Sequence, residues 1–278
     1  MKIEPLVSIV IPTRNAARAL RNCLEAIKNQ IYKKIEIIIV DQYSTDGTLE
    51  IIKNYNVKLF QIPHHGVYAG PTKSRNFGAN KSKGKYIFSV DSDWELQPTI
   101  VQECVEKCEK DGYGAVVVHE KDIAKNFWAK CRAFEKEMFI NDPYMESARF
   151  FRKDIFNKIS GYDENLNSGE DWDIHYRLKQ VTKVGDIKTR VLHNTWNVKF
   201  FKNMKKKFYY GTTYVKYRKK HPEWSKNQLT AFRYAYKKHW KKFVMHPFMT
   251  LAFIFYKMSE FTSAWVGIKY SKIKKLFQ

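Results

Sequence analysis

The sequence predicts an α/β fold, a doubly wound, mostly parallel sheet followed by a helical, basic C-terminal appendage. Apolar runs of strand length alternate with segments of helical spacing from residue 6 to residue 91. The run KIEIIIVD, residues 34–41, is nearly all apolar, as expected of a parallel strand that is buried on both faces. Residues 199–278 then change to a basic and aromatic composition.

The first part of the chain is expected to repeat strand and helix in order. The expected strands are residues 6–13, 34–41, 57–63 and 85–91, with helices at 16–31, at 44–55 and within 66–84. Leu20, Leu24, Ile27 and Ile31 follow helical spacing in the first of these helices. Such alternation is typical of a doubly wound sheet, whose ligands bind outside the carboxyl ends of the strands.

The second part is less regular. We expect strands at 115–120 and 183–194, a helix at 127–139, and a strand, a short helix and a turn within 148–166. Residues 168–180 are expected to form a helix that is capped by Ser168 and acidic in its first turn. The cysteines have no metal-binding spacing, so we interpret them as reduced core thiols of an intracellular protein: Cys23, Cys104, Cys108 and Cys131. The N-terminus does not have the pattern of a signal peptide.

The charge divides the chain near residue 198. The net charge is +22, yet residues 1–198 contain 30 Lys and Arg against 26 acidic residues. Residues 199–278, called here the basic region, contain 20 Lys and Arg and only two acidic residues, Glu223 and Glu260. We therefore predict one domain at 1–198 and a separate region at 199–278 that binds an anionic surface, either lipid headgroups or nucleic acid.

Polar side chains follow three of the expected strands at their carboxyl ends. The first strand ends in Pro12, Thr13, Arg14 and Asn15, the second in Asp41 with Asp46 after a short turn, and the fourth in Asp91, Ser92 and Asp93. An Asp-x-Asp pair at a strand end suits Mg²⁺ or Mn²⁺, which take oxygen ligands and substrate phosphates. Neither the dinucleotide fingerprint GxGxxG nor the phosphate loop GxxxxGK[ST] is present.

The neighbours of the acidic pair favour a nucleoside-diphosphate site. Asp41 and Asp46 offer acceptors to a base or a ribose, and three cations are available to phosphate oxygens: Arg14, Lys73 and Arg75. Each group also has a simpler interpretation. Acidic pairs open many loops, and Lys73 and Arg75 alone are equally well explained as solvated surface residues.

These motifs resemble those of family 2 glycosyltransferases, which have the GT-A fold, a Rossmann-like doubly wound sheet. The resemblance rests on three stretches: VSIVIPTRN with the later VDQYSTDGT, GPTKSRNFGANKSKGKYIFSVDSD, and SGYDENLNSGEDWDIHYRL. Together they cover about residues 6–195. The family pattern often has an acidic residue or Asn after Asp41, where this chain has Gln42, and no Gln-x-x-Arg-Trp motif of processive synthases follows.

The resemblance implies an inverting, non-processive, metal-dependent transfer of a sugar from a UDP- or GDP-sugar to a hydroxyl group. Asp91 and Asp93 would hold Mn²⁺ or Mg²⁺, with Asp93 the more direct ligand. His193 is a candidate third ligand or diphosphate contact, and a structural histidine is an equal alternative. The donor-binding set implied is Pro12, Thr13, Arg14, Asn15, Asp41, Asp46, Lys73, Arg75, Asp91 and Ser92.

The resemblance also implies a catalytic base. Asp171 would take the proton of the acceptor hydroxyl, and Glu170 beside it would orient or bind the acceptor. The alternative is that Glu170, Asp171 and Asp173 only complement the dipole of their helix. Trp94, next to the acidic pair, either packs under the sugar or belongs to the core.

The basic region predicts contact with a membrane. Residues 227–244 place five apolar residues at helical spacing among lysines, as in an interfacial amphipathic helix: Leu229, Phe232, Tyr236, Trp240 and Phe243. Residues 246–268 are nearly long enough to span a bilayer, but Lys257 and Glu260 interrupt them. We expect a peripheral or partly inserted hairpin on the cytoplasmic face, and an acceptor that is a lipid-linked glycan or a glycolipid.

Two other functions compete with this one. A nucleotidyltransferase also uses two carboxylates and a metal ion. The spacing of Asp41 and Ser-x-Asp-Gly-Thr argues against this function, as does the absence of a glycine-rich N-terminal loop. A nucleic-acid-binding protein would use the basic region for phosphates and bases, but it leaves the acidic strand ends unexplained, so nucleic acid is the less favoured partner.

Overall fold

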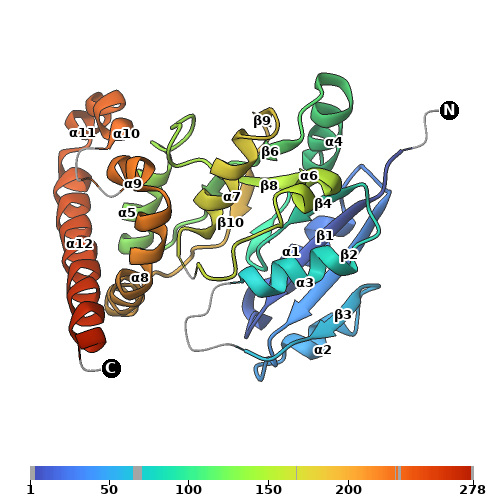
Figure 1. The fold of residues 1–278 in the computed structure, drawn as a ribbon, viewed down its shortest axis with the longest axis horizontal. Helices are drawn as coiled ribbons and strands as arrows, with labels where there is room; N and C mark the ends of the chain where they lie inside the picture. Colours follow the sequence, from blue (N-terminus) through green and yellow to red (C-terminus); the bar gives the residue numbers. More distant parts are fainter. Residues whose placement is uncertain (1–3, 65–70, 167, 229, 231–232, 277–278) are drawn as a thin grey trace. The chain divides into compact units, whose positions relative to one another are not determined.

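The computed structural model describes residues 4–64, 71–166, 168–228, 230 and 233–276 (Figure 1). They form two compact units. The first consists of Met1–Lys121, Ser147–Glu164 and Ile174–Asn194, and the second of Asp122–Glu146, Asn165–Asp173 and Thr195–Gln278. The second unit thus joins the basic region to two earlier segments of the chain, and the domain boundary expected at residue 198 stays a prediction.

The first unit is built on a large sheet with the strand order β3-β2-β1-β4-β8-β6-β9. The bounds in chain order are β1 Val7–Thr13, β2 Ile35–Asp41, β3 Lys58–Gln61, β4 Tyr86–Ser89, β6 Ala115–Val117, β8 Ala148–Arg152 and β9 Val184–Asp186. Strands β1 to β4 are mutually parallel, β6 and β9 are parallel, and only β8 runs antiparallel to its neighbours. The predicted doubly wound, mostly parallel sheet is confirmed.

Helices cover both faces of this sheet, because successive strand residues point to opposite faces. Ile9 and Ile11 of β1 are buried with α1 (Ala17–Lys28) and α4 (Ile100–Asp111). Val10 is buried on the other face with α3 (Thr72–Lys81), α6 (Lys153–Lys158) and the later turns of α7 (Glu170–Lys179). A short helix, α2 (Thr48–Ile52), follows β2. Each fully buried aliphatic side chain stabilises the fold by about 1.5–3 kcal/mol.

A small sheet, β5-β10-β7, holds the chain that follows the acidic pair. Its strands are β5 Trp94–Glu95, β7 Glu120–Asp122 and β10 Val191–His193. The single strands expected at 115–120 and 183–194 were therefore wrong, because each segment divides between the two sheets. Residues 187–190 turn between them, where the Thr189 backbone N–H donates to Glu103 of α4.

The second unit is helical. Its helices are α5 Phe127–Lys136, α8 Phe200–Lys220, α9 Pro222–Gln228, α10 Tyr234–Lys238, α11 Trp240–Met245 and α12 Pro247–Leu276, and α12 runs beside α8 (Figure 1). The first turn of α7 also belongs to this unit. Ser168, expected to cap α7, instead places its hydroxyl 3.0 Å from Thr213 Oγ1 of α8.

Two expectations about the basic region were wrong. The single amphipathic helix expected at 227–244 is broken, since Arg233 is extended and His239 separates α10 from α11. Arg233 leaves helical geometry and donates from its buried guanidinium to Glu135 Oε1, at 3.0 Å. Leu229 and Phe232 lie outside the described residues, as do 65–70 of the expected segment 66–84. The hairpin expected at 246–268 is instead part of one continuous helix, α12.

Two other expectations can be checked directly. All four cysteines are free and buried, which confirms their interpretation as core thiols. Among the helices that the structure describes, none has both the length and the apolar character that crossing a bilayer requires.

Candidate functional site

The loops after β1 and β2 are joined by hydrogen bonds between the two motifs that follow them. Asn15 donates from its backbone N–H to Ser44 Oγ at 2.8 Å, and its Oδ1 accepts from the Thr45 N–H at 2.8 Å. Asp46 Oδ2 accepts from the Ala17 N–H at 3.2 Å, and its other oxygen accepts from Thr48. These bonds outweigh the effect of burial and lower the pKa of Asp46. The residues of the two motifs therefore hydrogen-bond the loop after β1 to the loop after β2.

Asp41 ends β2 with its carboxylate enclosed. Its side chain has no exposed surface. Oδ1 accepts from Thr13 Oγ1 at 2.9 Å and from Ser44 Oγ at 2.5 Å, and Oδ2 accepts from the Ser44 N–H at 2.8 Å. Asp41 thus fixes the ends of β1 and β2 relative to each other. Pro12 and Thr13 belong to β1 itself, and Arg14 is exposed beside the imidazole of His64.

Asp91 is held by two arginines. Arg75 Nη2 donates to Oδ1 at 2.7 Å, and Arg149 Nη2 donates to Oδ2 at 3.3 Å. Burial alone would raise the pKa of Asp91, but the two guanidinium groups outweigh it and keep the pKa below its usual value. Arg75 was expected to contact phosphate, yet its side chain is only 3% exposed and bound to this carboxylate.

Asp93 lies beside His193 of β10. Asp93 is 43% exposed, and its Oδ2 lies 3.3 Å from His193 Nε2. The pairing of β5 with β10 accounts for this proximity, because it sets His193 opposite Trp94. On the other side of the ring, His193 Nδ1 lies 2.6 Å from Glu120 Oε2 of β7. The small sheet therefore brings together a carboxylate oxygen, an imidazole nitrogen and a second carboxylate that orients the imidazole.

This set of donors fits a divalent cation. Carboxylate oxygen suits Mn²⁺, imidazole nitrogen is a common ligand of first-row metals, and Asp93 remains accessible to solvent. Metal-binding histidines commonly donate their other ring N–H to a carboxylate, as the position of Glu120 allows. Sequence reasoning found Asp93 and His193 but missed Glu120 and Arg149. Only the pairing of strands distant in the sequence could have revealed these two residues.

The remaining predicted donor residues lie on nearby elements of the first unit. Lys73 is half-buried in the first turn of α3, and Ser92 is half-buried in the turn between β4 and β5. Trp94 is fully buried, with the Arg149 guanidinium 5.2 Å from the centre of its ring. Trp94 therefore belongs to the core and supports an arginine that holds Asp91.

The helix α3 approaches the sheet closely at a glycine of the Arg-Asn-x-Gly motif. A Cβ atom on Gly78 would lie 2.4 Å from Val10 Cγ1 of β1, so the site requires glycine. Asn76 accepts from the Tyr162 N–H at 2.9 Å and donates to the Tyr162 carbonyl at 2.8 Å. The Asn and Gly of this motif therefore hold α3 against the sheet, in the position from which Arg75 reaches Asp91.

Glu170 and Asp171 are half-buried in the first turn of α7, within the second unit. Asp173, two residues after Asp171, is fully buried, and its Oδ1 lies 2.7 Å from both Lys220 Nζ and His221 Nε2. Asp173 therefore links this turn to the end of α8. The carboxylates of the first turn differ in exposure, because Asp173 is fully buried and the other two are half-buried.

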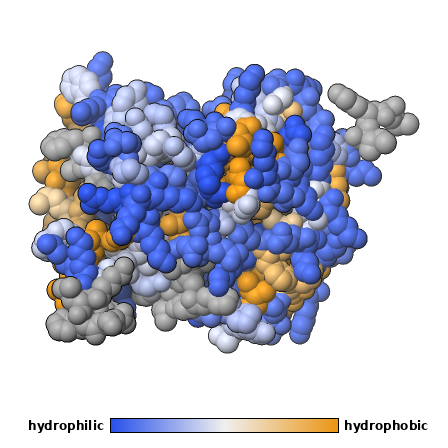
Figure 2. All heavy atoms as spheres, in the orientation of Figure 1, coloured by the Kyte–Doolittle hydropathy of each residue, from blue (hydrophilic) through white to orange (hydrophobic). Residues whose placement is uncertain are grey.

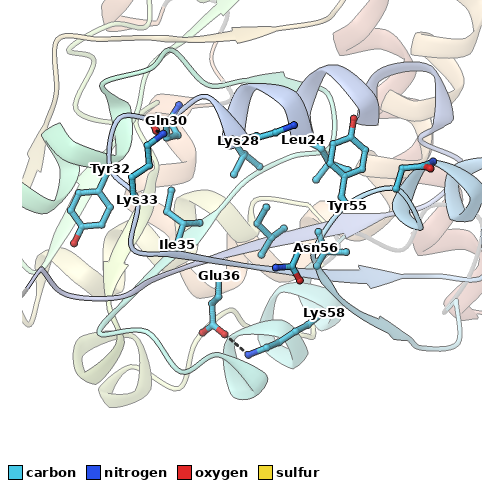
Figure 3. Close-up of a pocket in the computed structure, with 14 residues that line it drawn as sticks. Leu24, Lys28, Gln30, Tyr32, Lys33, Ile35, Glu36, Tyr55, Asn56 and Lys58 are labelled. Carbon is cyan, nitrogen blue, oxygen red and sulfur yellow. Dashed lines mark hydrogen bonds and ion pairs between the residues drawn. The ribbon is translucent and has the colours of Figure 1, made fainter.

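A cavity of about 470 Å³ lies at the opposite, amino ends of β2 and β3 (Figure 3). Its lining includes Lys28, Tyr32 and Tyr55, and the ion pair between Lys58 and Glu36 closes one side, at 2.6 Å. Because ligands of doubly wound sheets bind at the carboxyl ends, this cavity is separate from the candidate site.

Comparisons with known proteins agree on one family. The sequence profile of Glycosyl transferase family 2 matches residues 8–161. The chondroitin synthase of Pasteurella multocida is 28% identical over 207 residues, which cover 68% of this chain and 21% of that protein. The GalNAc(5)-diNAcBac-PP-undecaprenol beta-1,3-glucosyltransferase of Campylobacter jejuni is 27% identical over 156 residues, covering 52% of this chain and 49% of that protein.

A solved structure shows the same fold. The mannosyltransferase PcManGT of Pyrobaculum calidifontis, crystallised with GDP-Man and Mn²⁺, superposes with a TM-score of 0.65 at 14% identity, covering 98% of this chain and 89% of that one. The chain spans only about a fifth of the Pasteurella relative. Since the family profile matches more than half of the chain and the fold agrees, this protein belongs to glycosyl transferase family 2, with a GT-A fold.

Proposed function

We propose that this protein transfers a sugar, with inversion, from a UDP- or GDP-sugar to a hydroxyl of a lipid-linked glycan or glycolipid at the cytoplasmic face of a membrane. The observation that carries the proposal is the group of Asp93, His193 and Glu120 beside an Asp91 that two arginines hold in place. Such a group suits the diphosphate end of a nucleotide sugar together with Mn²⁺ or Mg²⁺.

The residues of the first unit would hold the donor. Asp93 and His193 would bind the cation, and Glu120 would keep the imidazole oriented. The cation, when bound, neutralises the charge of the departing diphosphate. Asp91 is ionised beside Arg75 and Arg149, so it would orient cationic groups or bound water near the diphosphate. Pro12, Thr13, Arg14 and Asn15 would border the nucleotide with Asp41 and Asp46.

Asp171 would act as the base. It would accept the proton of the acceptor hydroxyl while the hydroxyl oxygen forms a bond to the anomeric carbon and the bond from that carbon to the diphosphate breaks. Glu170 would bind or orient the acceptor. The buried contacts of Asp173 with Lys220 and His221 support this assignment, because they fix the helical turn on which Asp171 sits.

The acceptor is proposed from two independent sources of support. The Campylobacter relative is, by its name, a glucosyltransferase that acts on an undecaprenol-linked glycan. The basic region adds 20 Lys and Arg with only two acidic residues, a composition that favours anionic lipid surfaces. An acceptor that is itself anchored in lipid would be reached from such a surface.

Calorimetry tests the donor site. The protein is titrated with UDP and with GDP, each with and without Mn²⁺, and the Asp93→Asn variant is compared with Glu50→Gln, which changes an exposed carboxylate of α2. We expect Mn²⁺-dependent binding of one nucleotide, weakened about tenfold or more in Asp93→Asn and unchanged in Glu50→Gln. Binding that needs no metal, or that survives in Asp93→Asn, would contradict the proposed site. Tight RNA binding without metal-dependent nucleotide binding would favour a nucleic-acid-binding protein instead.

A further inference from the structure

The helix α12 exposes its large apolar side chains. They recur at spacings of three and four residues, which places them on one broad face: Phe248, Leu251, Ile254, Phe255, Met258, Trp265, Val266 and Ile273. Their exposed fractions range from 42% for Val266 to 88% for Phe248. We call this set the outer face of α12. So long an exposed apolar face is unusual on a surface that meets only water.

The charged residues of α12's central turns point the other way. Lys257 and Glu260 are 8% and 5% exposed. Lys257 Nζ lies 2.5 Å from Glu260 Oε2 and 3.1 Å from Glu135 Oε2 of α5, and Asn203 of α8 donates to Glu260 at 2.8 Å. Lys257 and Glu260 interrupt the apolar run of the sequence, but both lie on the inner side of the helix and leave its outer face continuous.

The contact between α8 and α12 combines close approach at two glycines with aromatic pairs such as Phe208 with Tyr270. A Cβ atom on Gly211 would lie 2.1 Å from the Ala264 carbonyl oxygen, and one on Gly267 would lie 2.0 Å from the Phe208 carbonyl oxygen. Close contact through small residues, with polar groups paired between helices and large apolar residues outward, is the packing of helices in lipid.

Cations border the outer face. Lys269 and Lys272 are exposed near its C-terminal end, and Lys241 is exposed on α11 beside the apolar residues Trp240 and Met245. The only acidic residue in 233–276 is the buried Glu260. Hydrophobic spheres lie along the margin of the space-filling view where α12 runs, with hydrophilic spheres next to them (Figure 2). An apolar face bordered by Lys complements an anionic bilayer.

We propose that the outer face of α12, with the adjoining residues of α11, lies in the interface of an anionic phospholipid bilayer. The inference deepens the proposed function by naming the surface that reaches the membrane. The apolar side chains would enter the boundary between headgroups and acyl chains, and the lysines would contact lipid phosphates. The inner side of α12, with its paired charges, would stay packed on α5 and α8.

Flotation with lipid vesicles tests this surface. Full-length protein is mixed with phosphatidylcholine vesicles, with or without phosphatidylglycerol, and centrifuged. Three proteins are compared: the unchanged chain, the outer-face variant Leu251→Ser with Met258→Ser and Trp265→Ser, and a control variant Ile31→Ser with Leu59→Ser. The control removes exposed apolar side chains from the first unit, where Ile31 is 50% and Leu59 is 39% exposed.

We expect the unchanged and control proteins to float with phosphatidylglycerol vesicles. The outer-face variant should partition into these vesicles at least about tenfold more weakly. Lys269→Glu with Lys272→Glu should reduce the preference for phosphatidylglycerol. Equal flotation of all variants, or no flotation of the unchanged protein, overturns the proposal. So does a dimer in light scattering that the outer-face variant converts to a monomer, because a second copy would then cover this face.

The same variants separate this inference from the proposed function. Nucleotide and Mn²⁺ binding, measured by calorimetry, should be the same in the outer-face variant and in the unchanged protein. Membrane binding without nucleotide binding would overturn the proposed function alone, whereas nucleotide binding without membrane binding would overturn the surface alone.

Discussion

At the scale of single residues, burial separates the acidic side chains of the motifs into two kinds. Asp41 and Asp173 are fully buried, and neighbouring hydroxyl, N–H or cationic groups hold their oxygens. Asp93 keeps 43% exposure and lies beside an imidazole. A sequence pattern marks all three as equally acidic, so only the structure distinguishes those that hold loops and helices from the one open to a ligand.

Glu120 is predicted to be a positioning residue. The Glu120→Gln variant loses the charge 2.6 Å from His193 Nδ1 and weakens the orientation of the ring. We expect Mn²⁺ affinity, measured by calorimetry in the presence of the bound nucleotide, to fall about 10- to 100-fold. The Glu120→Asp variant keeps the negative charge and should restore part of this affinity. If Glu120 had only a structural role, restoring the charge would not be expected to restore metal affinity. An unchanged Mn²⁺ affinity in Glu120→Gln would exclude the role.

His175 gives a prediction about pH and stability. Its side chain is 1% exposed, and burial, aided by the charge of Lys179, lowers its pKa from 6.5 to about 4. Between these values the unfolded chain binds a proton that the folded chain does not, so the free energy of unfolding falls as pH falls from 6.5 to 4. The loss should approach about 3 kcal/mol at pH 4.

Denaturant unfolding at a series of pH values checks this prediction. His175→Leu should flatten the dependence between pH 6.5 and 4 relative to the unchanged protein. His246→Gln, which replaces an exposed histidine, should leave the dependence unchanged. Parallel curves for His175→Leu and the unchanged protein would show that His175 is protonated in the folded chain.

The candidate site could be predicted only in part at this scale. Asp91, Asp93 and His193 were found because a strand-end position and a family motif mark them in the sequence. Glu120 and Arg149 were missed because nothing local to them marks a site. Their roles depend on β7 pairing in the small sheet and on β8 running antiparallel beside β4, which are contacts between segments far apart in the chain.

At the scale of elements, periodicity predicted the parallel strands and their helices well and the helices of the basic region poorly. The strands β1, β2 and β4 are nearly all buried or apolar, so their pattern has one interpretation. In α12 many large apolar side chains face outward, whereas the charged Lys257 and Glu260 face inward. Counting charges along the sequence could not reveal which way these two side chains point. Arg233 likewise interrupts an otherwise helical pattern because its guanidinium binds Glu135.

The crossing of α8 and α12 predicts a large effect of one added side chain. Gly267→Leu places atoms where the Phe208 carbonyl of α8 lies, so the helices must separate. We expect the free energy of unfolding to fall by about 1–3 kcal/mol or more, as for other overpacked sites. Thr262→Ala, at an exposed position of the same helix, should change it by less than about 0.5 kcal/mol. Thermal unfolding monitored by circular dichroism measures both, and equal stabilities would refute the close crossing.

At the scale of the whole molecule, the basic region is part of a unit that also holds the first turn of α7. Glu135 of α5 is paired with Arg233 and Lys257, and Asp173 of α7 is paired with Lys220 and His221. Tyr217 of α8 packs against the backbone of Gly169, which is in the left-handed conformation. The change of charge at residue 198 marks where the basic region begins in the sequence. It does not show which earlier segments of the chain the basic region contacts.

A chain that ends at residue 198 therefore removes the partners of two buried carboxylates. Leaving one partner of a buried ion pair uncompensated costs about 3–5 kcal/mol, and both Glu135 and Asp173 would be affected. We expect residues 1–198 to unfold at a lower temperature than the full chain, or to be recovered only in part as folded protein. The turn that bears Asp171 should lose its order, so any sugar transfer should be lost even where nucleotide binding persists. The outer-face variant, which changes only exposed side chains of α12, is the matched control and should unfold at the temperature of the full chain. If residues 1–198 matched the full chain in both unfolding temperature and transfer, the basic region would be a separable appendage that only binds membranes.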